Sequence, residues 1–198
     1  FTREQIRTLH QKALVEESAA SSEAPAPAPP TPGPTLSPVQ QAAADQIPGP
    51  DEGFNASLLF GITGSGKTEL YLHYLKQRLD DASQALVLVP EINLTPQTVA
   101  RFQRYFGHRI VVWHSALNDG ERLSTWLKVR NGEPVILIGT RSAVLLPFTH
   151  LKTIIVDEEH DRSYKQGEGF RYSGRDVAVY RGHLKQCPVR LGSATPSL

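Results

Sequence analysis

The sequence of 198 residues contains no methionine and only one cysteine, Cys187. A single thiol forms neither an internal disulfide nor a multi-cysteine zinc site, and such sparse cysteine fits a reducing cytosol. We therefore expect Cys187 to be a buried or half-buried apolar residue. No run approaches the length of about 18 apolar residues that a membrane helix needs, and no secretory leader is recognisable. These absences predict a soluble, intracellular chain.

Net charge is also nearly absent. The chain carries 21 basic and 20 acidic residues, a balance of +1, so its overall electrostatics give no argument for nucleic acid binding. The segment from Asp161 to Arg190 differs, because it holds seven basic and three acidic side chains, a local excess of +4. This segment is either a surface that faces nucleic acid or an ordinary solvated face.

The composition changes sharply along the first 34 residues. Residues 1–17 have helical apolar spacing, whereas residues 18–34 are rich in Pro, Ala and Ser, with six prolines among seventeen residues. Such a segment forms neither helix nor sheet and acts as an extended spacer. We predict that residues 1–17 are the tail of a preceding domain, residues 18–34 a linker and residues 35–198 the main domain. Because the chain starts without methionine and stops directly after a motif, we expect it to be a piece of a longer protein.

From residue 35 onward, short apolar runs alternate with longer amphipathic segments. Nearly continuous apolar runs are typical of strands buried on both faces of a parallel sheet, and the intervening segments predict helices on both sides of it. The clearest helix has Thr95 as N-cap, Pro96 at its first position and Gly107 at its end. Another places Leu123, Trp126 and Leu127 on one face and stops at residues 131–132. The predicted strands are Leu58–Phe60, Leu86–Val89, Ile110–Trp113, Val135–Ile138, Ile154–Val156 and Val189–Leu191.

Residues 61–68 read G-I-T-G-S-G-K-T, a complete phosphate-binding loop between a predicted strand and a predicted helix. Glycines let main-chain N–H groups approach phosphate oxygens, Lys67 can reach the β- and γ-phosphates, and the Thr68 hydroxyl can bind Mg²⁺. We therefore expect the loop to bind a nucleoside triphosphate. Its candidate binding residues are Gly61, Thr63, Gly64, Ser65, Gly66, Lys67 and Thr68.

A second motif, D-E-E-H at residues 157–160, follows the apolar run that ends at Val156. An aspartate at the carboxyl end of such a strand can bind Mg²⁺, and a neighbouring glutamate can orient and deprotonate the attacking water. We assign these parts to Asp157 and Glu158, so that Lys67, Asp157 and Glu158 are the candidate catalytic residues. His160 either relays between the nucleotide and the rest of the protein or caps the turn.

Together with G-S-A-T-P at 192–196 and V-P-E-I-N-L-T-P-Q-T at 89–98, these motifs resemble the superfamily 2 helicases. The longer tracts at 117–128, 138–142 and 157–166 closely resemble the primosomal protein N′ family of bacterial replication-restart helicases, over residues 36–198. The resemblance implies a RecA-like α/β lobe, with a mainly parallel sheet flanked by helices. It also implies that residues 1–17 belong to a DNA-binding domain.

The resemblance carries further roles onto matching residues. Gln40 matches the glutamine that recognises adenine in such helicases, and Gln41 is a weaker candidate. Ser193, Ala194 and Thr195 match the motif that links hydrolysis to movement of the lobes. Segments that face the DNA backbone are matched by Pro90, Glu91, Thr140 and Arg141.

Residues 164–172, Y-K-Q-G-E-G-F-R-Y, resemble the family's aromatic-rich loop, which senses single-stranded DNA and couples it to hydrolysis. Aromatic rings offer stacking faces to unpaired bases, and basic side chains between them can hold phosphates. The alternative is a surface loop that packs on its own lobe. The candidate DNA-coupling residues here are Tyr164, Lys165, Phe170, Arg171 and Tyr172.

The resulting hypothesis is the ATP-binding lobe of a 3′-to-5′ DNA helicase of replication restart. The resemblance implies ATP and Mg²⁺ as ligands, with zinc bound in the full-length family protein but not by this chain. It implies forked and single-stranded DNA, other primosome proteins and single-strand-binding protein as partners, no membrane, and a bacterial cytoplasmic, nucleoid-associated location. Because the resemblance implies a second lobe, we expect this chain alone to be weakly active or inactive. The alternatives are another superfamily 2 DNA or RNA helicase, a non-helicase phosphate-loop enzyme, and an interaction module without turnover.

Overall fold

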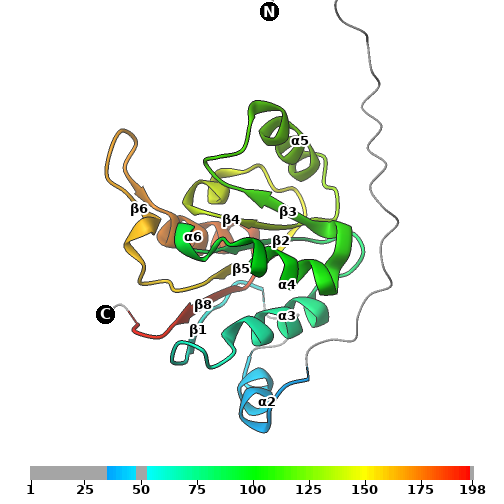
Figure 1. Ribbon diagram of the computed structural model, residues 1–198, viewed down its shortest axis with the longest axis vertical. Coiled ribbons are helices and arrows are strands. Elements are labelled where there is room, and N and C mark those ends of the chain that lie inside the picture. Colours follow the sequence, from blue (N-terminus) through cyan, green and yellow to red (C-terminus); the bar gives the residue numbers. More distant parts are fainter. Residues whose placement is uncertain (1–34, 48–52, 197–198) are drawn as a thin grey trace, which may run out of the picture.

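The computed structural model describes residues 35–47 and 53–196. The predicted tail 1–17 and linker 18–34 lie outside these residues. Within them, the chain forms one twisted parallel sheet with helices packed on both of its faces (Figure 1). In the described part of the chain, no helix has the length and apolar character needed to cross a membrane.

The sheet has six strands in the order β1-β8-β5-β2-β4-β3. Every neighbouring pair is parallel, which confirms the predicted parallel arrangement. Each of the six predicted apolar runs contributes to one strand, although several boundaries move by one to three residues. The strands are β1 (Ala56–Phe60), β2 (Gln84–Leu88), β3 (Ile110–Trp113), β4 (Ile136–Gly139), β5 (Leu151–Val156) and β8 (Val189–Ser193).

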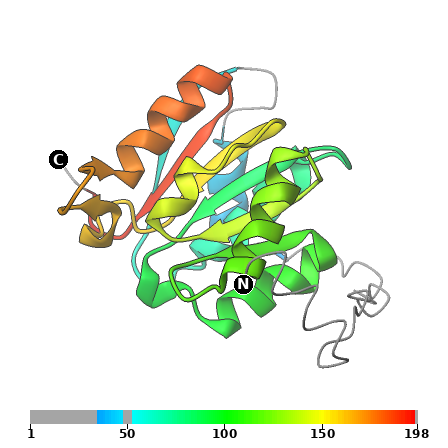
Figure 2. The same ribbon diagram turned by 90° about the horizontal axis from the view of Figure 1, so that it is seen from above.

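The helices cover the sheet in two layers (Figure 2). Helices α3 (Lys67–Arg78) and α4 (Pro96–Phe106) pack on one face, whereas α5 (Asp119–Arg130) and α6 (Gly174–Lys185) pack on the other. Helix α2 (Pro38–Asp45) lies beside α3. The shorter elements are η1 (Glu91–Asn93), η2 (Gly107–Arg109), η3 (Arg141–Leu145), η4 (Arg162–Tyr164), β6 (Lys165–Gln166) and β7 (Tyr172–Ser173).

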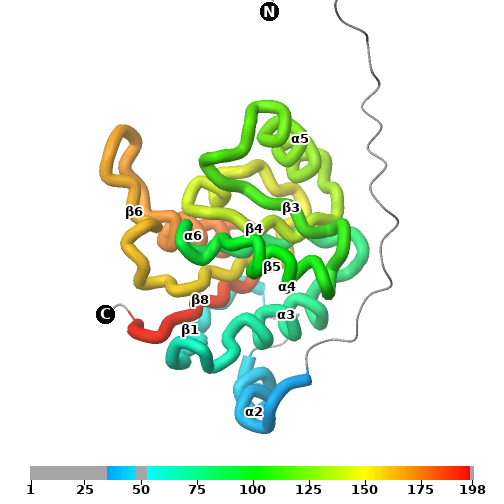
Figure 3. Tube along the Cα trace, in the orientation of Figure 1, coloured from blue at the N-terminus to red at the C-terminus, as the bar shows by residue number. Residues whose placement is uncertain are grey.

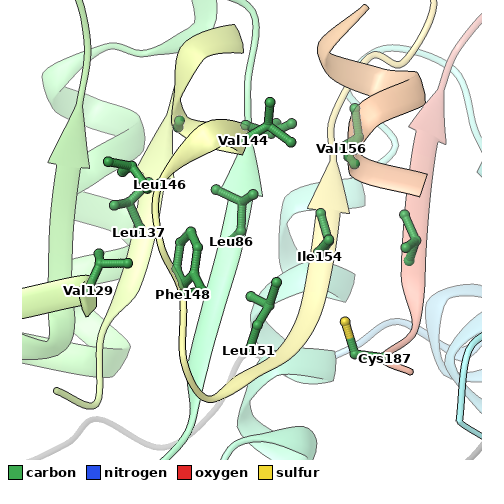
Figure 4. Close-up of a cluster of buried hydrophobic side chains, with 14 of the residues drawn as sticks. Leu86, Val129, Leu137, Val144, Leu146, Phe148, Leu151, Ile154, Val156 and Cys187 are labelled. Atoms are coloured by element: carbon green, nitrogen blue, oxygen red, sulfur yellow. The ribbon is translucent and has the colours of Figure 1, made fainter. Parts of the chain in front are cut away.

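Alternate residues of each central strand fill two separate cores. In β2, Leu86 and Leu88 point into the core under α5 and α6, whereas Ala85 and Val87 point into the core under α3 and α4. Figure 4 shows the first of these cores, in which Cys187 lies among aliphatic side chains. The Cys187 side chain is 3% exposed, which confirms the prediction of a buried apolar residue.

Local sequence determines where α4 begins and ends. The Thr95 hydroxyl accepts a hydrogen bond from the Thr98 backbone N–H, Pro96 occupies the first turn, and Gly107 ends the helix with φ 56°. These features confirm the predicted boundaries, because a side-chain oxygen satisfies a free N–H at the start and glycine tolerates the positive φ at the end.

The predicted face of α5 is only partly buried, and one expectation, about β1, is wrong. Leu123 and Leu127 of α5 are 57% and 39% exposed, whereas Trp126 packs against the core and Val129 is fully buried. Strand β1 is not buried on both faces, since Leu58 and Phe60 are 48% and 66% exposed. The reason is that β1 is an edge strand, paired within the described residues only with β8.

Candidate nucleotide-binding site

The phosphate loop, the D-E-E-H motif and the G-S-A-T-P motif meet at the carboxyl ends of the strands. The strand order makes β1, β8 and β5 neighbours, so the loops at their carboxyl ends lie side by side. Main-chain hydrogen bonds link these loops: Gly61 N donates to Ser193 O at 3.0 Å, and Glu159 N donates to Gly192 O at 2.9 Å. Ligands of open parallel sheets bind at this position.

The glycines of the phosphate loop have the predicted conformations. Gly64 and Gly66 adopt φ values of 82° and 85°, in the left-handed region that favours glycine. Gly61 does not have a positive φ, and a β-carbon there would lie 2.8 Å from Ser65 Oγ, so a larger residue would force the Ser65 side chain to move. Helix α3 begins directly after Gly66, so its N-terminal N–H groups face the loop.

Lys67 lies at the centre of the site and is only 8% exposed. Its Nζ donates a hydrogen bond to Gly61 O at 2.8 Å and forms an ion pair with Glu158 Oε1 at 3.2 Å. Lys67 and Glu158 line a cavity of about 210 Å³. Its walls are formed by Gly64, Gly66, Lys67, Thr68, Glu69, Arg101, Asp157 and Glu158. The candidate catalytic residues therefore share one cavity with part of the phosphate loop.

Of the two candidate glutamines, Gln40 reaches the phosphate loop. Its side-chain Nε2 donates to Ser65 O at 3.2 Å, while its Oε1 accepts from the Ser37 backbone N–H at the start of α2. The Gln41 amide instead donates to Asp45 on its own helix. Contact with the loop favours Gln40, and its recognition of adenine stays a prediction.

Asp157 lies at the end of β5 and is held by a neighbouring tyrosine. Tyr71 of α3 donates a hydrogen bond from its hydroxyl to Asp157 Oδ1 at 2.9 Å. Burial raises the pKa of the Asp157 carboxyl from its ordinary value, against the lowering effect of the Tyr71 hydrogen bond. A bound cation would remove this cost of burying the charge, which fits a metal-binding role.

Glu158 has a strained backbone, with φ 44°. Left-handed conformations of this kind concentrate at functional sites when they occur outside glycine. Besides the Lys67 ion pair, its carboxylate accepts a hydrogen bond through Oε2 from the Ala194 backbone N–H at 3.3 Å. Glu158 therefore connects the phosphate loop to the S-A-T motif.

His160 extends this connection. Its Nδ1 lies 2.7 Å from the Ser193 hydroxyl and 3.7 Å from Glu158 Oε2. Ser193 is fully buried. The contact favours the relay interpretation of His160, because a residue that merely caps its own turn would not reach β8.

The aromatic segment forms a hairpin, β6–β7, that stands out from the body of the domain (Figure 3). Phe170 at its tip is 79% exposed and lies 5.9 Å from the Tyr172 ring, centroid to centroid. Lys165 and Arg171 are also exposed. Phe170, Lys165 and Arg171 are therefore accessible to a nucleic acid, as the aromatic-loop interpretation requires, whereas Tyr172 is half-buried and packs against the core.

Tyr164 is not a stacking residue. Its side chain is 1% exposed because η4 turns the ring into the core, where its hydroxyl donates to Asp157 O at 2.6 Å. The prediction that Tyr164 offers a face to unpaired bases is therefore wrong. The hydroxyl instead connects the base of the hairpin to the metal-binding candidate.

Of two residues assigned to the DNA backbone, one is buried and the other binds main-chain oxygens of its own domain. Thr140 is only 4% exposed. The Arg141 guanidinium donates through Nη1 to the backbone oxygens of Ser163 and Lys165, at 3.2 and 2.8 Å. Direct phosphate binding by these side chains is therefore not supported, since Arg141 supports the start of the hairpin. In the neighbouring tract, Pro90 is buried and Glu91 is exposed.

Two residues of the site were missed by sequence reasoning, Tyr71 and Arg101. Tyr71 follows Lys67 by one helical turn, and this spacing was the available signal. Arg101 extends from α4 into the cavity and forms an ion pair with Glu69. No pattern in the sequence indicated that α4 packs beside the phosphate loop.

Comparison with known proteins agrees with this geometry. The DEAD/DEAH box helicase family matches residues 37–197. The replication restart protein PriA of Haemophilus influenzae is 53% identical over 146 residues, which are 74% of this chain and 20% of that protein. The PriA protein of Bacillus subtilis is 50% identical over 141 residues, 71% of this chain and 18% of that protein. The chain thus spans about a fifth of the length of these curated relatives.

Solved structures support the fold. The chain resembles RecG bound to a three-way DNA junction, with a TM-score of 0.60 and 23% identity, over 82% of this chain and 21% of that one. It also resembles the Pyrococcus furiosus Hef helicase domain, with a TM-score of 0.56 and 20% identity, over 81% of this chain and 33% of that one. The predicted RecA-like lobe is confirmed, and the family match over residues 37–197 establishes that this chain belongs to the DEAD/DEAH box helicases.

Proposed function

We propose that this chain is the ATP-binding and ATP-hydrolysing lobe of a DNA helicase that restarts replication at stalled or abandoned forks, translocating 3′ to 5′. The observation that carries the proposal is a complete phosphate loop whose Lys67 shares one cavity with Asp157 and Glu158. The similarity to PriA proteins from two bacteria supports the choice of replication restart.

The residues present fit Mg·ATP. Left-handed glycines, the start of a helix and a buried lysine line the cavity on one side, and two carboxylates line it on the other. Main-chain N–H groups of the loop and Lys67 Nζ would bind the phosphates, while Thr68 and Asp157 would hold Mg²⁺. When bound, the metal would neutralise the charge that develops on the phosphates during hydrolysis.

Glu158 would orient the attacking water and accept its proton. In the present arrangement its carboxylate is paired with Lys67, which also must bind phosphate. A triphosphate would compete for the ammonium group and release Glu158 Oε1, while Oε2 stays bonded to Ala194 N. Substrate binding would therefore free the base and keep it tied to the S-A-T motif.

Single-stranded DNA would bind at the β6–β7 hairpin. Phe170 supplies an exposed ring for stacking, and Lys165 and Arg171 supply cations for the phosphates. Coupling to hydrolysis would pass through the Tyr164 hydroxyl to Asp157, and through Ser193 and His160 to Glu158. By the resemblance to bacterial replication-restart helicases, forked DNA, primosome proteins and single-strand-binding protein are its partners in the bacterial cytoplasm.

The proposal is tested by ATP hydrolysis in the intact protein, measured with forked DNA, single-stranded DNA and RNA. Lys67→Ala should abolish turnover, and Glu158→Gln should retain ATP binding while losing hydrolysis. Lys76→Ala is the matched control, because Lys76 lies on the same helix and is exposed to solvent. Wild-type turnover in the Lys67 or Glu158 variant would contradict the proposal, and stimulation by RNA alone would indicate an RNA helicase.

A further inference from the structure

Tyr71 is a buried polar side chain that the proposed chemistry does not yet use. It lies on α3, 4% exposed, and its hydroxyl donates to Asp157 Oδ1 at 2.9 Å. It follows Lys67 by four residues, so the two side chains project from the same face of the helix toward the end of β5. Helix α3 thus supplies both a phosphate-binding candidate and a partner for the metal-binding candidate.

The hydroxyl has little freedom to leave Asp157. It packs against Gly192 of the G-S-A-T motif so closely that a β-carbon at Gly192 would overlap it. The contact with Gly192 on one side and the hydrogen bond to Asp157 on the other therefore hold the hydroxyl in place.

Asp157 is held on both sides of the sheet. Tyr71 belongs to the core under α3 and α4, and bonds the carboxylate. Tyr164 belongs to the opposite core, and its hydroxyl bonds the main-chain oxygen of the same residue at 2.6 Å. Two tyrosine hydroxyls from separate cores thus fix the side chain and the backbone of one aspartate.

We propose that Tyr71 is a positioning residue for ATP hydrolysis, which holds the Asp157 carboxylate in the orientation that binds Mg²⁺. By occupying Oδ1, it fixes the rotation of the carboxylate and leaves Oδ2 as the oxygen for the metal. The inference rests on the proposed function, because it requires Asp157 to be a metal-binding residue. Partners of metal ligands commonly contribute 10- to 100-fold, as an order of magnitude, to metal affinity or activity.

The test is Tyr71→Phe in the intact protein, with Tyr74→Phe as the matched control. Tyr74 lies on the same helix, is 6% exposed and also forms a buried hydrogen bond, with the Thr153 hydroxyl at 3.2 Å. It does not line the cavity that contains Asp157. Each variant thus loses one buried hydroxyl, but only Tyr71→Phe releases the carboxylate.

For Tyr71→Phe we expect the Mg²⁺ concentration for half-maximal ATPase to rise about tenfold and kcat to fall about tenfold. The KM for ATP at saturating Mg²⁺ should change far less, because the phosphate loop is intact. Tyr74→Phe should leave all three values unchanged. Urea denaturation of both variants separates folding from positioning. A loss of stability alone would reduce the amount of folded protein, but it would not change the Mg²⁺ concentration that the folded molecules need for half-maximal ATPase.

An unchanged Mg²⁺ requirement in Tyr71→Phe, or an equal change in Tyr74→Phe, would overturn the inference and leave the proposed function intact if Lys67→Ala is inactive. Full activity of Lys67→Ala would overturn the proposed function, and the inference with it.

Discussion

Gln84 provides a stability test that follows directly from the geometry. Its side chain is fully buried, and its amide makes four hydrogen bonds to the main chain. Nε2 donates to the backbone oxygens of Val129 and Glu133 at 2.8 and 3.0 Å, and Oε1 accepts from the N–H groups of Thr149 and His150 at 3.0 and 2.9 Å. One side chain therefore satisfies the end of α5 and the loop before β5.

Gln84→Leu preserves most of the volume and removes all four bonds. Each bond contributes a net stabilisation of about 1 kcal/mol, so the free energy of unfolding should fall by about 4 kcal/mol. With a urea m-value of about 2 kcal/mol/M, the unfolding midpoint should drop by about 2 M. Domains of this kind are stable by only about 5–15 kcal/mol, which makes the loss large.

Equilibrium urea unfolding of the chain, followed by the fluorescence of Trp113 and Trp126, measures this change. Gln97→Leu is the control, because Gln97 is exposed on α4 and the same substitution there should alter stability by no more than about 0.5 kcal/mol. A midpoint shift below about 0.5 M for Gln84→Leu would refute the reasoning, since it would mean that water replaces the lost partners without cost.

Four further predictions concern the hairpin, the nucleotide-binding cavity and the core. Phe170→Ala should reduce DNA-stimulated ATPase without changing stability, because the ring is exposed. Tyr164→Phe should also reduce the stimulation, although its buried ring never faces DNA, because it loses the hydrogen bond to Asp157 O. Equal losses of the basal and the DNA-stimulated rates would contradict both predictions. Arg101→Ala should weaken ATP binding about fivefold, an effect of about 1 kcal/mol, because it removes one of the two cations lining the cavity. The control is Arg104→Ala, because Arg104 lines the neighbouring cavity and not this one; it should not alter affinity measured with a fluorescent nucleotide. Burial raises the Cys187 pKa to about 11, so at pH 8 about one thiol in a thousand is ionised. The native protein should therefore react slowly with a thiol reagent. Stoichiometric labelling within minutes would contradict the buried position of Cys187.

The fold was largely predictable because the central strands have two buried faces. Runs such as Leu86–Val89 and Ile154–Val156 admit few other arrangements, and Thr95, Pro96 and Gly107 mark a helix through local chemistry alone. Prediction failed at β1 for a tertiary reason. The same apolar pattern occurs there, but whether a strand lies at the centre or the edge of a sheet depends on which other strands pair with it.

In the site, residues that act through their own motif were brought together as expected, with Lys67, Asp157 and Glu158 around one cavity. Residues whose part depends on distant packing were not predictable. In the sequence, Tyr164 is one aromatic residue of a polar segment. Its ring points into the core because the chain forms the short helix η4 there, and no local pattern indicated that helix. Gln84 gives no local sign that it satisfies four main-chain groups across the domain.

The pairing of β1 with β8 determines when the phosphate loop can be completed. These are the first and last strands of the sheet along the chain, paired from Ala56 with Val189 to Phe60 with Ser193, more than 130 residues apart. Contacts between such distant segments form late, because the intervening chain must be ordered first. A nascent chain that has not yet reached β8 has no partner strand for β1 among the described residues. Nucleotide affinity should therefore arise only at the end of the domain's synthesis, which would make ATP binding a signal that the lobe is complete.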